Sequence, residues 1–248
     1  MKRHLKKLIS TVSIIVGLML LVSVPEISAI DSPDYTRGAH RGASLDFEEN
    51  TLDAFRSAVK DPLYEFIEFD IQLTSDGKMA VIHQNSKFRI PKKFSYVSTM
   101  TYEEVQEKFE FYVPTYEEVI EIVKEKPLQI DIKSSKNLTN DQELIDFLIP
   151  DLETRGVTEY ILSSTSEDIV KYTEETYPHV ETGRVFWVTT NSIFPTGNSV
   201  AKFYDSTVAD YVFIHAYNLR NYDLLIENKP EDVEIAFWYF TDEIYLMN

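Results

Sequence analysis

The sequence feature that most constrains the fold is a regular alternation of short apolar runs with longer amphipathic stretches. The apolar runs are almost continuous, as is typical of strands that are covered on both faces in a parallel sheet. Helical patterns lie between several of them, at Thr51–Val59, Thr115–Lys124 and Asp141–Leu148. The apolar runs predict eight strands, at Tyr35–Ala39, Phe66–Leu73, Met79–His83, Leu128–Ile132, Glu159–Ser163, Arg184–Val188, Tyr211–His215 and Glu234–Phe240.

Eight strands that alternate with helices predict an α/β fold with a TIM-type (β/α)8 barrel. A doubly wound sheet would show the same alternation. However, the chain has only seven Gly, and no Gly-rich phosphate-binding turn follows a predicted strand. We therefore predict the barrel.

The first 29 residues have the order of a secretory signal peptide. A basic start precedes the uncharged apolar run Leu8–Val24, and the small residues Ser28 and Ala29 follow. This order predicts a signal peptide over residues 1–29 and a barrel domain over residues 30–248; an uncleaved membrane anchor is the alternative. We expect a secreted or extracellular protein with no stable membrane insertion after cleavage. An uncleaved segment would hold it at the outer face of the membrane.

Charge and cysteine content exclude several classes of function. The chain has 24 basic and 41 acidic residues, of which residues 1–29 hold four and one, so the remainder carries a net charge of 20 − 40 = −20. Such a protein repels nucleic acid, and an anionic substrate would need a local positive site or a bound cation. The chain has no Cys, which excludes disulfides and thiolate catalysis.

Charged residues lie inside the apolar strands that we predict. Glu68 and Asp70 are two positions apart on one strand, so their side chains point to the same face, and Asp131 and Lys133 repeat this spacing later in the chain. In a barrel these groups would meet at the carboxyl ends of the strands. Three carboxylates there would suit one divalent cation, Ca²⁺ or Mg²⁺. The alternative is a buried ion pair of Glu68 or Asp131 with Lys133 or Arg41.

Two histidines end predicted strands on either side of the carboxylate pair. His40 follows the first strand and His83 ends the third, so they are candidates for the base and the acid of phosphoryl transfer. His179 follows a proline in a predicted loop, and we expect it at the surface. His215 also ends a strand but has no acidic neighbour in sequence, so we expect it to line the pocket at most.

These residues resemble the glycerophosphodiester phosphodiesterase family, within the phospholipase-C-like phosphodiesterase superfamily of TIM barrels. The resemblance is strongest from about residue 38 to 134 and looser through Ser163-Ser164 and Trp238–Thr241. The matching segments are Gly38–Ser44, Glu49–Phe55, Ile67–Gly77, Val81–His83, Pro114–Val119 and Ile130–Lys133.

The resemblance implies hydrolysis of small-molecule glycerophosphodiesters to glycerol 3-phosphate and an alcohol. It implies that Glu68, Asp70 and Asp131 hold the metal ion and that His40 and His83 are the catalytic base and acid. It also implies that Arg41 and Lys133 hold phosphate oxygens and that Trp238 contacts the substrate.

The chain departs from the family pattern at four places. Gln84 stands where the family has Asp, Glu48 where it often has Pro, and Asp131 where it usually has Glu. The Trp238–Thr241 segment is followed by a tail that is shorter than usual, which leaves the C-terminal closure of the barrel in question. A catalytically weak protein of the same fold that binds glycerophosphodiesters or a cation is therefore the alternative function. A phosphodiesterase of the same superfamily that acts on phosphoinositides or sphingolipids is a third hypothesis.

Overall fold

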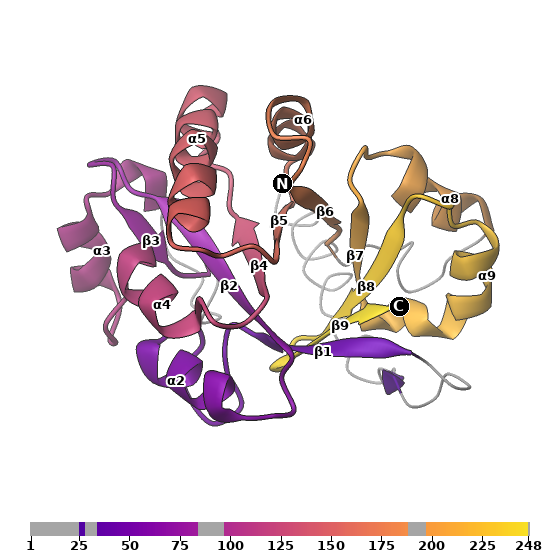
Figure 1. Cartoon of the computed structure of the whole chain (residues 1–248), viewed down its shortest axis with the longest axis horizontal. Coiled ribbons are helices and arrows are strands. Elements are labelled where there is room, and N and C mark those ends of the chain that lie inside the picture. Colours follow the sequence, from indigo (N-terminus) through magenta and orange to yellow (C-terminus); the bar gives the residue numbers. More distant parts are fainter. Residues whose placement is uncertain (1–24, 28–33, 84–96, 188–196, 248) are drawn as a thin grey trace, which may run out of the picture.

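The fold is a closed barrel of mostly parallel strands with helices on its outside (Figure 1). The computed structural model describes residues 25–27, 34–83, 97–187 and 197–247. Within these residues, the strands form one sheet in the order β1-β9-β8-β7-β6-β5-β4-β2-β3, and a further β1–β2 pairing closes it. The strands are β1 (Tyr35–His40), β2 (Phe66–Leu73), β3 (Met79–Val81), β4 (Leu128–Ile132), β5 (Tyr160–Ser164), β6 (Glu181–Val185), β7 (Tyr211–His215), β8 (Glu234–Trp238) and β9 (Glu243–Met247).

The helices begin at side-chain caps that the sequence supplies. Thr101 and Thr115 each form a capping box with the glutamate three residues later, which satisfies the free N–H groups of the first helical turn. The α-helices are α2 (Leu52–Lys60), α3 (Tyr102–Lys108), α4 (Tyr116–Val123), α5 (Leu138–Thr154), α6 (Glu167–Thr176), α8 (Gly197–Asp205) and α9 (Tyr222–Glu227), and the 3₁₀ helices are η2 (Val97–Thr99) and η3 (Ala216–Asn221).

The barrel is confirmed, but one predicted strand lies outside the ring and another was predicted with the wrong bounds. The predicted third strand, β3, pairs antiparallel with β2 and lies outside the closed ring. The predicted sixth strand starts three residues too late, because β6 opens at the exposed Glu181 rather than within the apolar run.

The strand that closes the barrel, β9, was not predicted. It pairs antiparallel with both β8 and β1, so the ring is mixed rather than wholly parallel. Only residues 239–242 separate β8 from β9, and a parallel crossover needs a dozen residues or more. A short turn therefore forces an antiparallel strand here, and this strand fills the position that the shortened tail left in question.

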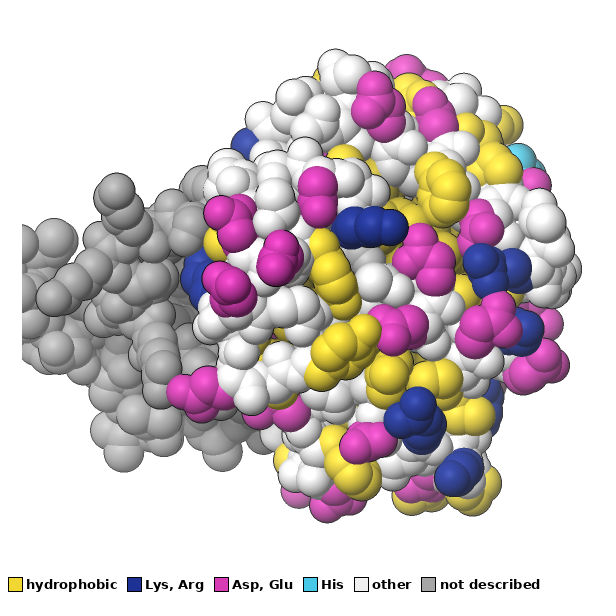
Figure 2. All heavy atoms as spheres, turned by 90° about the vertical axis from the view of Figure 1, so that its left-hand side faces the viewer, with side chains coloured by type: hydrophobic (Ala, Val, Ile, Leu, Met, Phe, Trp, Pro, Cys, Tyr) yellow, Lys and Arg dark blue, Asp and Glu magenta, His cyan; other side chains and the backbone are white. Residues whose placement is uncertain are grey.

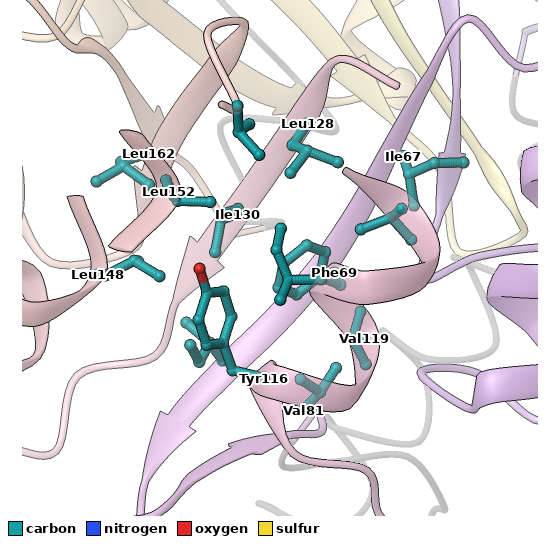
Figure 3. Close-up of a cluster of buried hydrophobic side chains, with 14 of the residues drawn as sticks. Ile67, Phe69, Val81, Tyr116, Val119, Leu128, Ile130, Leu148, Leu152 and Leu162 are labelled. Atoms are coloured by element: carbon teal, nitrogen blue, oxygen red, sulfur yellow. The ribbon is translucent and has the colours of Figure 1, made fainter. Parts of the chain in front are cut away.

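The main core lies between the barrel wall and the helices α4 and α5 (Figure 3). Ile67 and Phe69 of β2 face Tyr116 and Val119 of α4 there, together with residues of β4 and α5. Inside the barrel, Gly183 leaves room for the Phe213 ring, since a Cβ at this position would lie 2.4 Å from Cε2 of that ring. The Phe213 ring thus fills part of the barrel interior.

Residues 25–27 lie against the barrel although they belong to the predicted signal peptide. Ile27 is buried in the cluster around β7 and β8, and the Tyr239 hydroxyl donates to the Pro25 carbonyl oxygen at 3.0 Å. The rest of residues 1–29 lies outside the described residues. None of the described helices is long and apolar enough to span a bilayer.

The outer surface on the α3–α4 side carries many acidic side chains, interspersed with basic and hydrophobic ones (Figure 2). No single-sign basic face is visible there that would attract nucleic acid.

Candidate active site

The pairing register of three neighbouring strands brings the predicted charged residues together. His40 of β1 is the register partner of Glu68 of β2, and Asp70 of β2 is the partner of Asp131 of β4. Because side chains alternate along a strand, Glu68 and Asp70 both point into the barrel near its mouth. One oxygen from each of Glu68, Asp70 and Asp131 lies within 4.8 Å of the others, and all three residues are buried.

Two basic side chains are paired with these carboxylates. Lys133 Nζ lies 2.6 Å from Asp70 Oδ1 and also contacts Asp131 Oδ2. Arg41 lies 3.3 Å from Asp70 through Nε and 2.7 Å from Glu49 Oε2 through Nη1. The ion pairing that the sequence left as an alternative is therefore present, and it occurs within the same cluster as the carboxylates.

The turn after β1 places Arg41 by an unusual backbone conformation. Arg41 has φ 63° and Gly42 has φ 76°, and a Cβ at position 42 would lie 2.9 Å from the Ala54 backbone. Glycine is therefore required at position 42. The Arg41 N–H donates to Glu68 Oε2 at 2.8 Å, so the turn itself holds one of the carboxylates.

Asn50, just before α2, supports the carboxylate cluster with two hydrogen bonds. Its side-chain N–H donates to Asp70 Oδ2 at 2.8 Å, and its Oδ1 accepts from the Asp70 backbone N–H at 3.2 Å. The residue is buried and has φ 58°, a left-handed conformation that Asn tolerates better than most side chains. The next residue, Thr51, caps α2, so one short segment starts a helix and fixes a site carboxylate.

The charges of the cluster do not balance. Four carboxylates (Glu49, Glu68, Asp70 and Asp131) face two cations (Arg41 and Lys133). Burial, with the Asp70 charge, raises the pKa of Glu68 well above its usual value, and burial also raises the pKa of Asp131. Burial opposes ionisation of Asp70 as well, but Lys133, His83 and Arg41 together lower its pKa. When all four carboxylates are ionised, four negative charges face two positive ones, and a bound cation would oppose the protonation that burial favours at Glu68 and Asp131.

This excess fits a divalent cation. The donors are all carboxylate oxygens, which hard cations prefer. Asp131 Oδ1 is buried and has no hydrogen-bond partner among the described residues. Glu68, Asp70 and Asp131 are thus a possible metal site, as the sequence predicted.

The two candidate histidines line the same pocket as the carboxylates. His40 Nδ1 lies 2.9 Å from the Thr241 carbonyl oxygen, so Nδ1 carries the proton, and the other ring nitrogen, Nε2, lies 4.0 Å from Glu68 Oε2. His83 Nδ1 is buried and has no hydrogen-bond partner among the described atoms. Burial and the Arg41 charge lower the pKa of His40, and burial lowers the pKa of His83 to about 3. Both rings are therefore neutral at pH 7.

Trp238 forms part of an aromatic wall of this pocket, which encloses about 160 Å³. Its ring centroid lies 6.3 Å from that of His40. His215, which we expected to line the pocket at most, packs its ring 4.6 Å from Trp238 and is buried. His179 lies at the surface, as expected, 2.9 Å from Glu153.

Several residues at the site were not predicted. Asn50 and Glu49 lie in a segment noted only as a helix start, and Asp70, the partner of Asn50, lies 20 positions away in the sequence. Tyr64 donates to Asp242 Oδ2 in the turn that holds His40, and nothing local in sequence pairs these two residues. Trp187 lines the pocket although it lies in a predicted strand. Gln84 lies outside the described residues.

Comparison with known proteins shows to which family the sequence is similar. The sequence profile of the Glycerophosphoryl diester phosphodiesterase family matches residues 40–230. A glycerophosphodiester phosphodiesterase of Caldanaerobacter subterraneus subsp. tengcongensis is 29% identical over 159 residues, which are 60% of this chain and 65% of that protein. The match thus spans less than two thirds of this relative's length.

Solved structures share the fold at low identity. A glycerophosphodiester phosphodiesterase from Thermotoga maritima superposes with a TM-score of 0.59 at 22% identity, over 83% of this chain and 85% of that one. An Oleispira antarctica phosphodiesterase, solved with the product sn-glycerol-3-phosphate, superposes with a TM-score of 0.58 at 18% identity, over 82% and 83% of the two chains. The structures agree on the barrel, and the family profile covers more than half of the sequence. The chain therefore belongs to the glycerophosphoryl diester phosphodiesterase family.

Proposed function

We propose that this protein hydrolyses glycerophosphodiesters to glycerol 3-phosphate and an alcohol in a metal-dependent reaction. One observation carries the proposal: of three buried carboxylates within 4.8 Å of one another, Glu68 and Asp131 line a pocket together with two histidines and two cationic side chains. Family membership supports the same reaction, as does the glycerol 3-phosphate bound to the Oleispira antarctica phosphodiesterase.

Glu68, Asp70 and Asp131 would hold the cation, Ca²⁺ or Mg²⁺. When bound, the cation supplies positive charge that stabilises the phosphate oxygens as negative charge builds on them. Arg41 and Lys133 lie beside the same carboxylates and add fixed positive charge for those oxygens.

His40 has the geometry of a general base. The Thr241 carbonyl oxygen accepts a hydrogen bond from Nδ1–H of His40, so the Nε2 lone pair remains free to accept a proton from the attacking hydroxyl or water. His83 lines the same pocket and is the candidate acid for the leaving alcohol. Because its ring is neutral at pH 7, this role requires that His83 take up a proton when the phosphodiester binds. Trp238 offers a buried indole N–H that has no partner among the described residues and can donate to the substrate.

A second function, capture of a glycerophosphodiester or cation without turnover, is favoured by one contact. Lys133 bridges Asp70 and Asp131, two of the three proposed metal ligands. If this bridge persists in the loaded protein, the site binds its ligand but lacks a free phosphate-binding cation.

The test is release of glycerol 3-phosphate from glycerophosphocholine by the full chain, with Ca²⁺ or Mg²⁺ and then with EDTA. Glu68→Gln removes one proposed ligand, and Glu153→Gln, at an exposed carboxylate beside His179, is the matched control. We expect EDTA and Glu68→Gln to abolish release and Glu153→Gln to leave it unchanged. Folded protein that binds the metal but releases no product from any head group would support the binding function instead.

We also propose that the protein is exported. The order of basic, apolar and small residues in positions 1–29 supports this. N-terminal sequencing of protein from the culture medium and from membranes tests it. A start at residue 30 supports cleavage, whereas a membrane-bound chain that retains residues 25–27 supports the anchor.

A further inference from the structure

The pocket has two chemically different ends. One end carries the charged residues, among them Glu68, Asp131 and Lys133. The remaining lining residues are Thr165, Val185, Trp187, Phe213, Trp238 and Ile244, which include no charged side chain. A phosphodiester bound with its phosphate at the charged end would place one of its two alcohol groups against aromatic rings.

Trp187, Trp238 and Phe240 form an aromatic corner at this end. The Trp187 and Trp238 rings are stacked, with centroids 5.8 Å apart and planes at 30°. Phe240 stands across both, at 73° to Trp187 and 88° to Trp238, with centroids 6.4 Å and 5.3 Å away. Trp187 is 53% exposed and Phe240 is 64% exposed, so a substantial part of each residue is accessible.

A buried histidine, His215, supports the corner. The buried His215 ring lies 4.6 Å from Trp238 and 4.5 Å from Phe240, and its Nδ1 accepts the Tyr217 backbone N–H at 3.1 Å. This hydrogen bond fixes the His215 ring, which in turn supports both aromatic rings. The corner is thus a built feature of the pocket rather than a chance exposure of single side chains.

We propose that this corner binds a quaternary ammonium group, so that the preferred substrate is the choline diester. The inference rests on the proposed function. A cation within about 6 Å of an indole ring is attracted to the ring face. In a choline phosphodiester, only the ester oxygen and two methylene groups separate phosphorus from nitrogen, so one short arm links the two ends of the pocket. The chain's net charge of −17 also favours a head group that carries positive charge.

The corner suits choline better than other alcohols. A primary ammonium, as in ethanolamine, needs several hydrogen-bond acceptors, and Thr165 is the one polar residue among the six at this end. A glycerol head group has the same need for polar partners. A quaternary ammonium needs none, because it is weakly hydrated and its methyl groups pack on aromatic faces.

The decisive comparison uses an uncharged isostere. Glycerophosphocholine and its 3,3-dimethylbutyl analogue have the same shape, but carbon replaces nitrogen in the analogue. We expect kcat/KM for the choline diester to exceed that of the analogue about fivefold or more, and Trp187→Leu to abolish this preference. Phe147→Leu, at an exposed aromatic of α5, is the control. Equal rates for the two diesters in the unmodified protein would overturn the proposal and leave an apolar subsite.

A binding measurement separates this proposal from the proposed function. The two Trp of the chain both lie in this pocket, so tryptophan fluorescence reports on the corner alone. We expect phosphocholine and tetramethylammonium to change this fluorescence saturably, and 3,3-dimethylbutanol to do so more weakly. Saturable binding with no turnover of any diester would refute the proposed hydrolysis but leave ammonium binding at the corner intact. Turnover without any fluorescence response to either ammonium compound would refute ammonium binding at the corner but leave the proposed hydrolysis intact.

Discussion

The backbone carbonyl oxygen of Thr241 lies 2.9 Å from Nδ1 of His40, although 201 positions separate the two residues. The neighbouring carbonyl of Asp242 accepts the His40 backbone N–H at 2.8 Å. The turn between β8 and β9 therefore fixes both the tautomer and the position of this histidine. A hydrogen bond of this kind to one ring nitrogen determines what the other nitrogen can do.

Replacing His40 should remove activity but not metal binding. We expect His40→Ala to lower kcat by about 10²-fold or more, since general base catalysis contributes at least about that factor. Isothermal titration with Ca²⁺ or Mg²⁺ should stay unchanged because the three proposed ligands remain. His179→Ala, at the surface, is the control. Normal turnover by the His40→Ala protein would exclude His40 as the base.

Tyr64 should act on the reaction through the turn that holds His40. Its hydroxyl donates to the buried Asp242 Oδ2 at 2.5 Å, so Tyr64→Phe leaves this oxygen without its partner. We expect the free energy of unfolding to fall by about 1–3 kcal/mol and kcat to fall with little change in KM. Urea denaturation and steady-state kinetics measure the two effects. The Tyr172 hydroxyl donates to the exposed Asp146, so the control Tyr172→Phe should change neither stability nor kcat. An unaltered kcat in the Tyr64→Phe enzyme would show that this turn does not contribute to catalysis.

Two substitutions of Asn50 separate its side-chain role from its backbone role. Asn50→Gly removes both hydrogen bonds to Asp70 but accepts φ 58°, whereas Asn50→Ala removes the same bonds and adds strain. We expect both to weaken metal affinity by about 10- to 100-fold. The Ala variant should be less stable than the Gly variant by about 1 kcal/mol or more. Equal metal affinity in all three proteins would show that Asp70 needs no support from Asn50.

The buried His215 should make the fold sensitive to acid. Burial lowers the pKa of His215 to about 4, while the unfolded value is about 6.5. Between these pH values the unfolded chain binds a proton that the folded protein excludes, so the free energy of unfolding falls as pH drops from 6.5 to 4. Above pH 6.5 this histidine makes no pH-dependent contribution.

Urea denaturation between pH 7 and pH 4 tests this expectation. His215→Gln should make the fall shallower, by at most about 1.4 kcal/mol per pH unit for one proton. The exposed His179→Gln should leave the slope as it is. Identical slopes for His215→Gln and the unmodified protein would contradict the assigned pKa.

The sequence contained enough to predict the barrel and the position of its charged end. Alternation along a strand places Glu68 and Asp70 on one face, and this holds whichever strands lie beside them. The parallel arrangement then brings Asp131 and His40 to the same end. These inferences succeeded because they depend on local geometry and on one general property of parallel barrels. The roles of these residues in catalysis stay predictions.

The failures have a common physical cause. Met79–Val81 reads as a buried strand, and it is one, but whether a buried strand joins the ring depends on its partners rather than on its own residues. Glu243–Met247 is short and follows a four-residue turn, so its pairing with β1 cannot be read locally. Thr241 acts through a carbonyl group that every residue has, and for that reason no side-chain pattern could have identified it.

The antiparallel last strand has a consequence for the order of folding. Because β9 pairs with β1, the ring closes only when two segments more than 200 positions apart in the sequence have met. Contacts between such distant segments form slowly, since a long loop must first be closed. The folding chain therefore lacks both a closed barrel and a fixed His40 until β9 and the turn before it have reached β1.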